Sequence, residues 1–122
     1  MEHKFVFDGM IKTAEDILDG KAKFQNAQVI VVRTENDNEY GVFIADPLTK
    51  EKTEEKAFIK MLCDKNERKI NYILCLWQNG GIDIPSADLR RMFADLVPEN
   101  KNTGIFVMSD TGPSLIKLEI TL

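Results

Sequence analysis

The sequence predicts an α+β fold in which about three helices pack on a five-stranded sheet. Residues 70–77 are almost all apolar, which is typical of a strand buried on both faces and therefore central in a sheet. Pairs of short apolar runs separated by polar turns indicate antiparallel neighbours. The order of elements, helix-strand-strand-helix-strand-helix-strand-strand, therefore favours a mainly antiparallel or mixed sheet with helices packed on it.

The first helix is predicted over residues 10–19. Apolar residues recur there at helical spacing, and Gly20 suits the position just past a helix end. Thr13 and Asp16 have the spacing of a capping box, with Asp in place of the usual Glu or Gln. Residues 4–7 before this helix are predicted to form a short strand.

A hairpin is expected next. The run over 29–32 is β-branched throughout, residues 35–38 are a polar turn cluster, and 40–45 form the returning strand. Asp46 and Pro47 end that strand. A second helix follows over about 50–65, with an apolar stripe formed by Phe58, Ile59, Leu62 and Cys63.

The charges argue against a nucleic-acid partner. The chain holds 20 acidic and 16 basic residues, a formal net charge of −4. The most basic stretch, residues 49–69, begins with alternating signs over 50–56, which predicts a solvated helix face and not a stripe for phosphates.

The third helix, over residues 86–97, has the clearest pattern. Ser86 is the expected N-cap, with Asp83 as an alternative, and Pro98 ends the helix. Its apolar residues recur at i, i+3, i+4, i+7 and i+8, namely Leu89, Met92, Phe93, Leu96 and Val97. A strand over 105–108 follows, and the alternation over 114–122 predicts a last, half-solvated antiparallel strand.

The segment Ser109-Asp110-Thr111-Gly112-Pro113 joins these last two strands. Asp110-Thr111-Gly112 resembles the core triplet of retroviral-type aspartic proteases, which need two such carboxylates and therefore a symmetric dimer. In that family a small residue follows the triplet and a long β-rich stretch comes after it. Here Pro113 follows and only nine residues remain, so a tight turn with Asp110 exposed is predicted.

The length of 122 residues is that of one domain, so a single α+β domain over 1–122 is expected. No apolar run approaches the ~20 residues of a membrane span. The N-terminus is too short and too acidic for a signal peptide, which favours the cytoplasm as the location and predicts no membrane partner.

No cofactor or metal is predicted from the cysteine and histidine content. Cys63 and Cys75 lie within apolar runs and are expected to be buried and reduced, although a disulfide stays open as an alternative. His3 is the only histidine, and a site built from it would need both cysteines and additional acids. This scarcity of histidine also makes an enzyme the less favoured expectation.

Two functions are therefore considered. The first is a module without catalysis that binds a protein partner or forms a homodimer, using the last strand as a sheet edge. The alternative is a binder of an anionic small molecule, or an enzyme, that uses the turn after the central strand and the start of the 86–97 helix. The ligand-binding residues predicted for this alternative are Trp77, Asn79, Gly80, Gly81 and Ser86.

Overall fold

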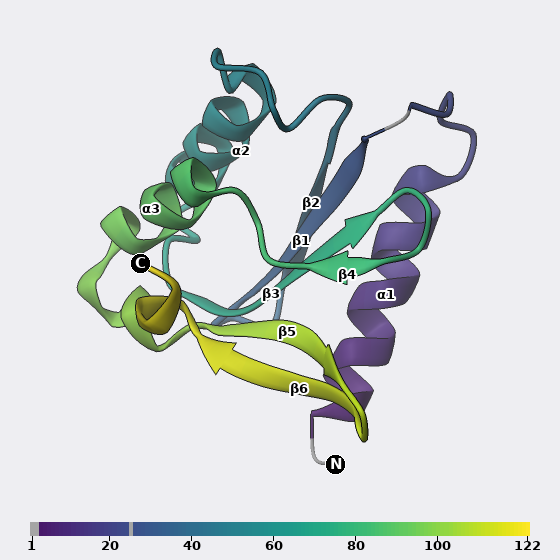
Figure 1. The fold of residues 1–122 in the computed structure, drawn as a ribbon. Coiled ribbons are helices and arrows are strands. Elements are labelled where there is room, and N and C mark those ends of the chain that lie inside the picture. Colours follow the sequence, from purple (N-terminus) through teal and green to yellow (C-terminus); the bar gives the residue numbers. More distant parts are fainter. Residues whose placement is uncertain (1–2, 25) are drawn as a thin grey trace.

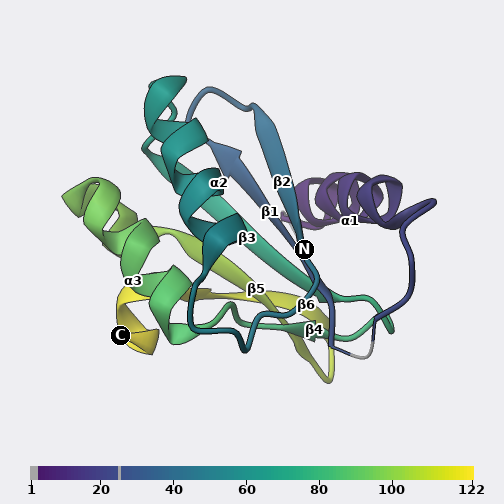
Figure 2. The same ribbon diagram turned by 90° about the horizontal axis from the view of Figure 1, so that it is seen from above.

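The fold has three layers, with a mixed sheet between α1 on one face and α2 and α3 on the other (Figures 1 and 2). It is taken from a computed structural model that describes residues 3–24 and 26–122. The prediction of an α+β fold with three helices on a mixed sheet is confirmed. The sheet has six strands where five were expected, because a two-residue strand follows the turn after the central strand.

The five longer strands lie in the order β2-β1-β3-β5-β6, and β4 pairs with β3. All pairings are antiparallel except that of β3 with β5, which is parallel. The strands are β1 Gln28–Thr34, β2 Glu39–Ile44, β3 Ile70–Trp77, β4 Ile82–Asp83, β5 Gly104–Ser109 and β6 Gly112–Lys117.

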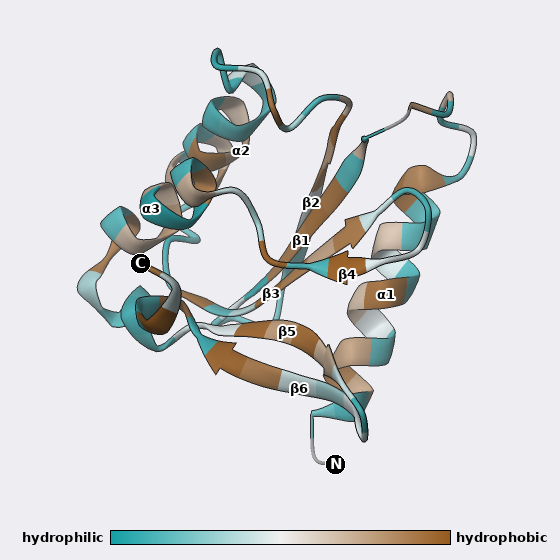
Figure 3. Cartoon of the chain, in the orientation of Figure 1, coloured by the Kyte–Doolittle hydropathy of each residue, from teal (hydrophilic) through white to brown (hydrophobic). Residues whose placement is uncertain are grey.

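Strand β3 is the centre of the molecule, as its apolar run predicts. Ile73 and Cys75 belong to the core between the sheet and α2 and α3. Leu74 and Leu76 belong to the core between the sheet and α1. Figure 3 shows hydrophobic residues along β1 and β5, on either side of β3. Alternate residues of β3 therefore hold both helical layers on the sheet.

Helix α1 spans Lys4–Leu18, so the prediction of a strand over 4–7 is wrong. Phe7 instead extends the apolar face of the helix by a turn and meets Phe106 of β5 edge-on, with 5.2 Å between ring centroids. Thr13, predicted to cap the helix, lies within it and donates a hydrogen bond to the carbonyl oxygen of Gly9 at 3.1 Å. Among the described residues, no helix is long and apolar enough to cross a membrane.

Helices α2 (Thr53–Asp64) and α3 (Ala87–Leu96) confirm the two later helix predictions. They lie side by side and begin at the same end of the molecule in both views (Figures 1 and 2). Phe58 of α2 and Phe93 of α3 pack edge-on, with ring centroids 6.4 Å apart. The first turns of the two helices therefore lie on one side of this contact.

The C-terminal part confirms the hairpin but not the length of its second strand. Ser109 pairs with Gly112, so Asp110 and Thr111 form a two-residue turn in which Asp110 is exposed. Strand β6 ends at Lys117, and a 3-10 helix covers Leu118–Thr121. A second 3-10 helix over Pro98–Asn102 replaces the expected polar linker.

Candidate functional site

A buried carboxylate lies at the start of α2. The side chain of Glu55 is 1% exposed, and neither of its oxygens has a hydrogen-bond partner among the described residues. A buried polar group without a partner destabilises a protein by roughly 1–3 kcal/mol, and a charged one by more. Such a group therefore calls for an explanation.

Lys52 supplies a positive charge beside this carboxylate. Its Nζ lies 3.7 Å from Oε2 of Glu55, too far for a hydrogen bond but close enough for an ion pair, and its side chain is 9% exposed. The ammonium donates a hydrogen bond to the carbonyl oxygen of Pro47. Lys52 also has a φ of 54°, in the left-handed region that residues other than glycine seldom adopt.

The prediction of a solvated helix face over 50–56 is wrong for Lys52 and Glu55. Glu55 stands three, four and seven residues before Phe58, Ile59 and Leu62, so it belongs to the apolar stripe of the helix. A charged residue in phase with an apolar stripe was the signal that could have identified it. The alternation of charges in the sequence concealed that signal.

The start of α3 lies at the same edge of the sheet. Trp77 at the end of β3 pairs with Gln28, and Gln28 pairs with Ile44 at the end of β2, from which the chain continues to α2. Ser86 is the N-cap of α3 as predicted, and its Oγ accepts a hydrogen bond from the backbone N–H of Leu89 at 3.3 Å. The chain therefore reaches α2 after a strand that ends at this edge of the sheet, and it reaches α3 after the turn that follows Trp77 and strand β4.

The turn after β3 is a tight hairpin connection to β4. The backbone N–H of Gly80 donates to the carbonyl oxygen of Trp77 at 2.8 Å, and that of Gly81 donates to Oδ1 of Asn79 at 3.0 Å. The indole Nε1 of Trp77 donates to Oδ2 of Asp83 at 3.1 Å. Both of these glycine N–H groups are thus used within the turn, whereas the buried oxygens of Glu55 have no hydrogen-bond partner among the described residues.

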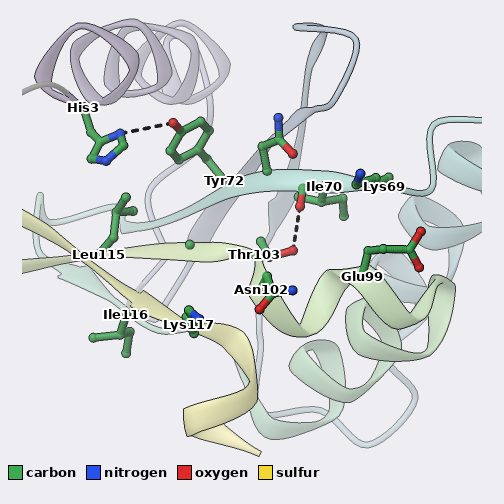
Figure 4. A pocket seen from close by; sticks show the side chains of 12 residues that line it. His3, Lys69, Ile70, Tyr72, Glu99, Asn102, Thr103, Leu115, Ile116 and Lys117 are labelled. Carbon is green, nitrogen blue, oxygen red and sulfur yellow. Dashed lines mark hydrogen bonds between the residues drawn. The ribbon is translucent and has the colours of Figure 1, made fainter.

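A cavity of about 500 Å³ lies at the other end of β3 (Figure 4). There His3 and Tyr72 are joined by a hydrogen bond of 3.1 Å between Nδ1 and the phenol oxygen, and Leu115 and Lys117 of β6 line the far wall. This cavity could not be predicted from the sequence, because its walls come from segments far apart in the chain. Its polar side chains are solvated or paired, unlike Glu55.

The cysteines do not form a site. The structure has no disulfide between them; Cys75 is buried as expected, whereas Cys63 is half-buried. Burial, with a smaller effect of the Asp83 carboxylate, raises the pKa of the Cys75 thiol to about 12. No group of three His, Cys, Asp or Glu residues that could hold a metal ion occurs in the described part of the chain.

Solved structures of cytidine deaminases share this fold over nearly the whole chain. The enzyme from Burkholderia pseudomallei matches with a TM-score of 0.69 and 10% identity, covering 94% of this chain and 94% of its own. The enzyme from Mycobacterium leprae matches with a TM-score of 0.65 and 17% identity, covering 95% and 96%. That from Mycobacterium tuberculosis gives 0.65 and 12%, covering 95% and 93%. No protein-family model and no curated protein sequence matches the chain.

Zinc deaminases carry the signature H-x-E followed by P-C-x-x-C, in which His or Cys and two Cys residues hold the metal and the Glu is the general acid and base. The segments of this chain with that spacing are Thr53-Glu54-Glu55 at the start of α2 and Pro85-Ser86-Ala87-Asp88-Leu89 at the start of α3. The glutamate and the proline are present. The three ligand positions hold Thr53, Ser86 and Leu89.

These three residues do not fit a zinc ion. Zinc in proteins is bound by thiolates, imidazoles and carboxylates, whereas Leu89 has no donor atom and is 1% exposed in the core. The hydroxyl of Ser86 is used as a helix cap. The chain thus has a fold similar to that of cytidine deaminases, while its residues at the spacing of the zinc ligands do not form a set that can hold the metal.

The similarity to cytidine deaminases contradicts the expectation of a protein-binding module without catalysis. It also contradicts the leaning against an enzyme, because the neighbours are enzymes and match over most of their length. The scarcity of histidine misled that expectation. In the deaminase signature the general acid and base is a glutamate, and a single glutamate is not conspicuous in an acidic chain.

Proposed function

We propose that this chain binds a nucleoside, nucleotide or free nucleobase at the starts of α2 and α3, on a cytidine deaminase fold. The observation that supports the proposal is Glu55, which is buried, has no hydrogen bond to another described residue and follows Thr53 at the spacing of the glutamate in the deaminase signature. The similarity of fold supports the same class of ligand, since cytidine is a nucleoside. Of the functions considered from the sequence, this is the small-molecule alternative.

The chemistry of Glu55 selects for ligands with N–H donors. A carboxylate only accepts hydrogen bonds, and the exocyclic amine and protonated ring nitrogens of nucleobases donate them. Hydrogen bonds to a charged group in a desolvated site are stronger than neutral ones. Glu55 is also the group positioned to exchange a proton with a bound ligand, so turnover of a ligand would depend on it.

A thermal-shift screen tests the proposal, with cytosine, cytidine, deoxycytidine, cytidine monophosphate and the corresponding purines as probes. We expect at least one probe to raise the melting temperature and to change the fluorescence of Trp77, which lies at the same strand end. Comparing nucleoside with nucleotide shows whether an anionic group contributes. Ammonia release from each bound probe measures turnover.

Glu55→Gln and Glu54→Gln form a matched pair of variants. Glu54 lies in the same turn but is exposed, so its substitution should leave binding unchanged. Glu55→Gln should weaken binding by about tenfold or more, since it removes a charge-assisted hydrogen bond. A panel without any stabilising probe, or equal binding by both variants, would refute the proposal.

Self-association is a second proposal, supported by the edge of the sheet. Among the described residues, strand β6 has a neighbour only on the β5 side, and Ile120 and Leu122 just beyond it are 72% and 44% exposed. An open strand edge with nearby apolar side chains is a surface for pairing with a second copy. Light scattering coupled to size exclusion should show a homo-oligomer that Ile120→Lys weakens, and a monomer at every concentration would exclude it. A cytoplasmic location remains a proposal as well.

A further inference from the structure

The buried pair of Lys52 and Glu55 at the start of α2 supports a second inference, because Thr53, Ser86 and Leu89 do not fit a zinc ion. In zinc deaminases the metal ion is a positive charge in the same site as the general acid and base glutamate. This chain has no donors for the metal, but it has an ammonium group 3.7 Å from the carboxylate of Glu55. Both side chains are withdrawn from solvent.

We infer that the site is metal-independent and that the ammonium of Lys52 supplies the buried positive charge that zinc supplies in zinc deaminases. The inference rests on the proposed function in one respect, the assignment of the site to the starts of α2 and α3. Its tests measure metal content and stability without any ligand, so it can fail while ligand binding holds, and ligand binding can fail while it holds.

The position of Lys52 is built and not incidental. A lysine on a solvated turn would extend into water, whereas the stem of Lys52 is covered and its ammonium is fixed between the carbonyl oxygen of Pro47 and Oε2 of Glu55. The left-handed backbone of Lys52 turns the chain into the helix directly before Thr53. The residue that brings the charge thus immediately precedes the first lost ligand position.

Two of the residues at the ligand positions have structural roles in the fold. Leu89 belongs to the apolar core that includes Phe58 and Phe93, so the position that would carry a thiolate contributes to packing. Ser86 retains a polar side chain but uses it to cap α3. Two of the three ligand positions therefore have structural roles that a bound metal would displace.

Metal analysis of the purified full chain is the first test. After exposure to zinc and dialysis, we expect no bound zinc, and we expect the same melting temperature with and without a chelator. One tightly bound zinc ion per chain, with a melting temperature that the chelator lowers, would overturn the inference.

A variant that restores the ligands tests whether these positions surround one point in space. Thr53→His, Ser86→Cys and Leu89→Cys together should bind one zinc ion per chain. The control moves the same residue types one position along each helix, as Glu54→His, Ala87→Cys and Arg90→Cys, and should bind none. Equal zinc binding by both triple variants, or none by a folded first variant, would contradict the placement of the site.

A double-mutant cycle provides a measurement that does not depend on the triple variant folding. Lys52→Met leaves Glu55 buried without its counter-charge and should lower the melting temperature by roughly 10 °C. Adding Glu55→Gln removes the stranded charge, so the double variant should recover at least half of that loss. The same cycle on Lys60 and Asp64, an exposed pair 2.7 Å apart, should show almost no coupling. Additive losses at Lys52 and Glu55 would mean that the two side chains do not act as a pair.

Discussion

Asn100 is predicted to be among the most important polar side chains for stability, although it lies in what the sequence presents as a linker. It is fully buried in the 3-10 helix after α3. Its Nδ2 donates to the carbonyl oxygens of Phe93 at 2.9 Å and Arg68 at 2.8 Å, and its Oδ1 accepts from the backbone N–H of Ile70 at 2.9 Å. One side chain therefore joins the end of α3 to the start of the central strand.

Asn100→Ala should lower the free energy of unfolding by about 3–4 kcal/mol, because three hydrogen bonds of ~1 kcal/mol each are lost and backbone groups are left unpaired. Urea denaturation followed by circular dichroism measures this as a lower midpoint at an unchanged slope. Asn100→Asp keeps the volume but turns carboxylate oxygens toward two carbonyl oxygens, so it should be at least as destabilising at neutral pH. Asn102→Ala, at an exposed position nearby, is the control and should change stability by less than about 0.5 kcal/mol. A loss below about 1 kcal/mol for Asn100→Ala would refute the reasoning, since it would show that water replaces all three bonds.

Three further predictions each concern a single residue. Ser86→Ala removes the cap that accepts from the N–H of Leu89 and should destabilise the protein by about 1 kcal/mol in the same urea assay. Burial raises the pKa of Cys75 from 9.0 to about 12, so Cys75 should react with a thiol reagent only on unfolding, while the half-buried Cys63 reacts earlier. The folded state favours the neutral thiol of Cys75. The free energy of unfolding should therefore fall as pH rises from 9.0 toward 12. Gly112→Ala forces a side chain onto a φ of 111° and should lower the melting temperature, with a cost of about 1–3 kcal/mol, and an unchanged melting temperature would mean that the hairpin adopts another turn.

The central strand and the third helix could be predicted because the spacing of apolar residues along each segment already indicates which side chains are buried. Eight consecutive residues from Ile70 to Trp77 leave the chain no solvated face, and the structure gives this strand the same bounds. The spacing from Leu89 to Phe93 and the cap at Ser86 define α3 in the same way. In both cases the pattern and the tertiary environment agree, so local reasoning is sufficient.

The N-terminus could not be predicted because four residues do not distinguish a strand from a helix. Phe5, Val6 and Phe7 suit a strand by propensity, but Phe7 packs on Phe106, which is remote in sequence. The prediction of a last strand as far as residue 122 is wrong for a related reason. Its alternation over 114–122 is regular, yet Leu118 is fully buried and Ile120 is 72% exposed, because the chain leaves the sheet at Lys117 and turns into a 3-10 helix.

Part of the candidate site could be predicted from the sequence. Ser86 and the turn after Trp77 were identified, because caps and glycines are explicit signals. The alternating charges over 50–56 predict that Glu55 is solvated, whereas its phase relative to Phe58 and Leu62 indicates burial, which the structure shows. Phase is the stronger indicator, since it follows from helix geometry, whereas alternating charges also occur around buried pairs.

The buried pair of Lys52 and Glu55 is better explained by function than by stability. Replacing a buried ion pair with apolar residues of similar volume is often neutral or stabilising, and Glu55 stands in an apolar stripe above Phe58 where a leucine would extend the core. The left-handed backbone of Lys52 adds a second local cost at the same turn. Two unfavourable features within four residues, at the end of the molecule where α3 also begins, match the usual placement of strain and unusual charge at functional sites. A fold alone does not determine an activity. The buried charge of Glu55 and the left-handed backbone of Lys52 are, however, two features at one turn that stability does not explain.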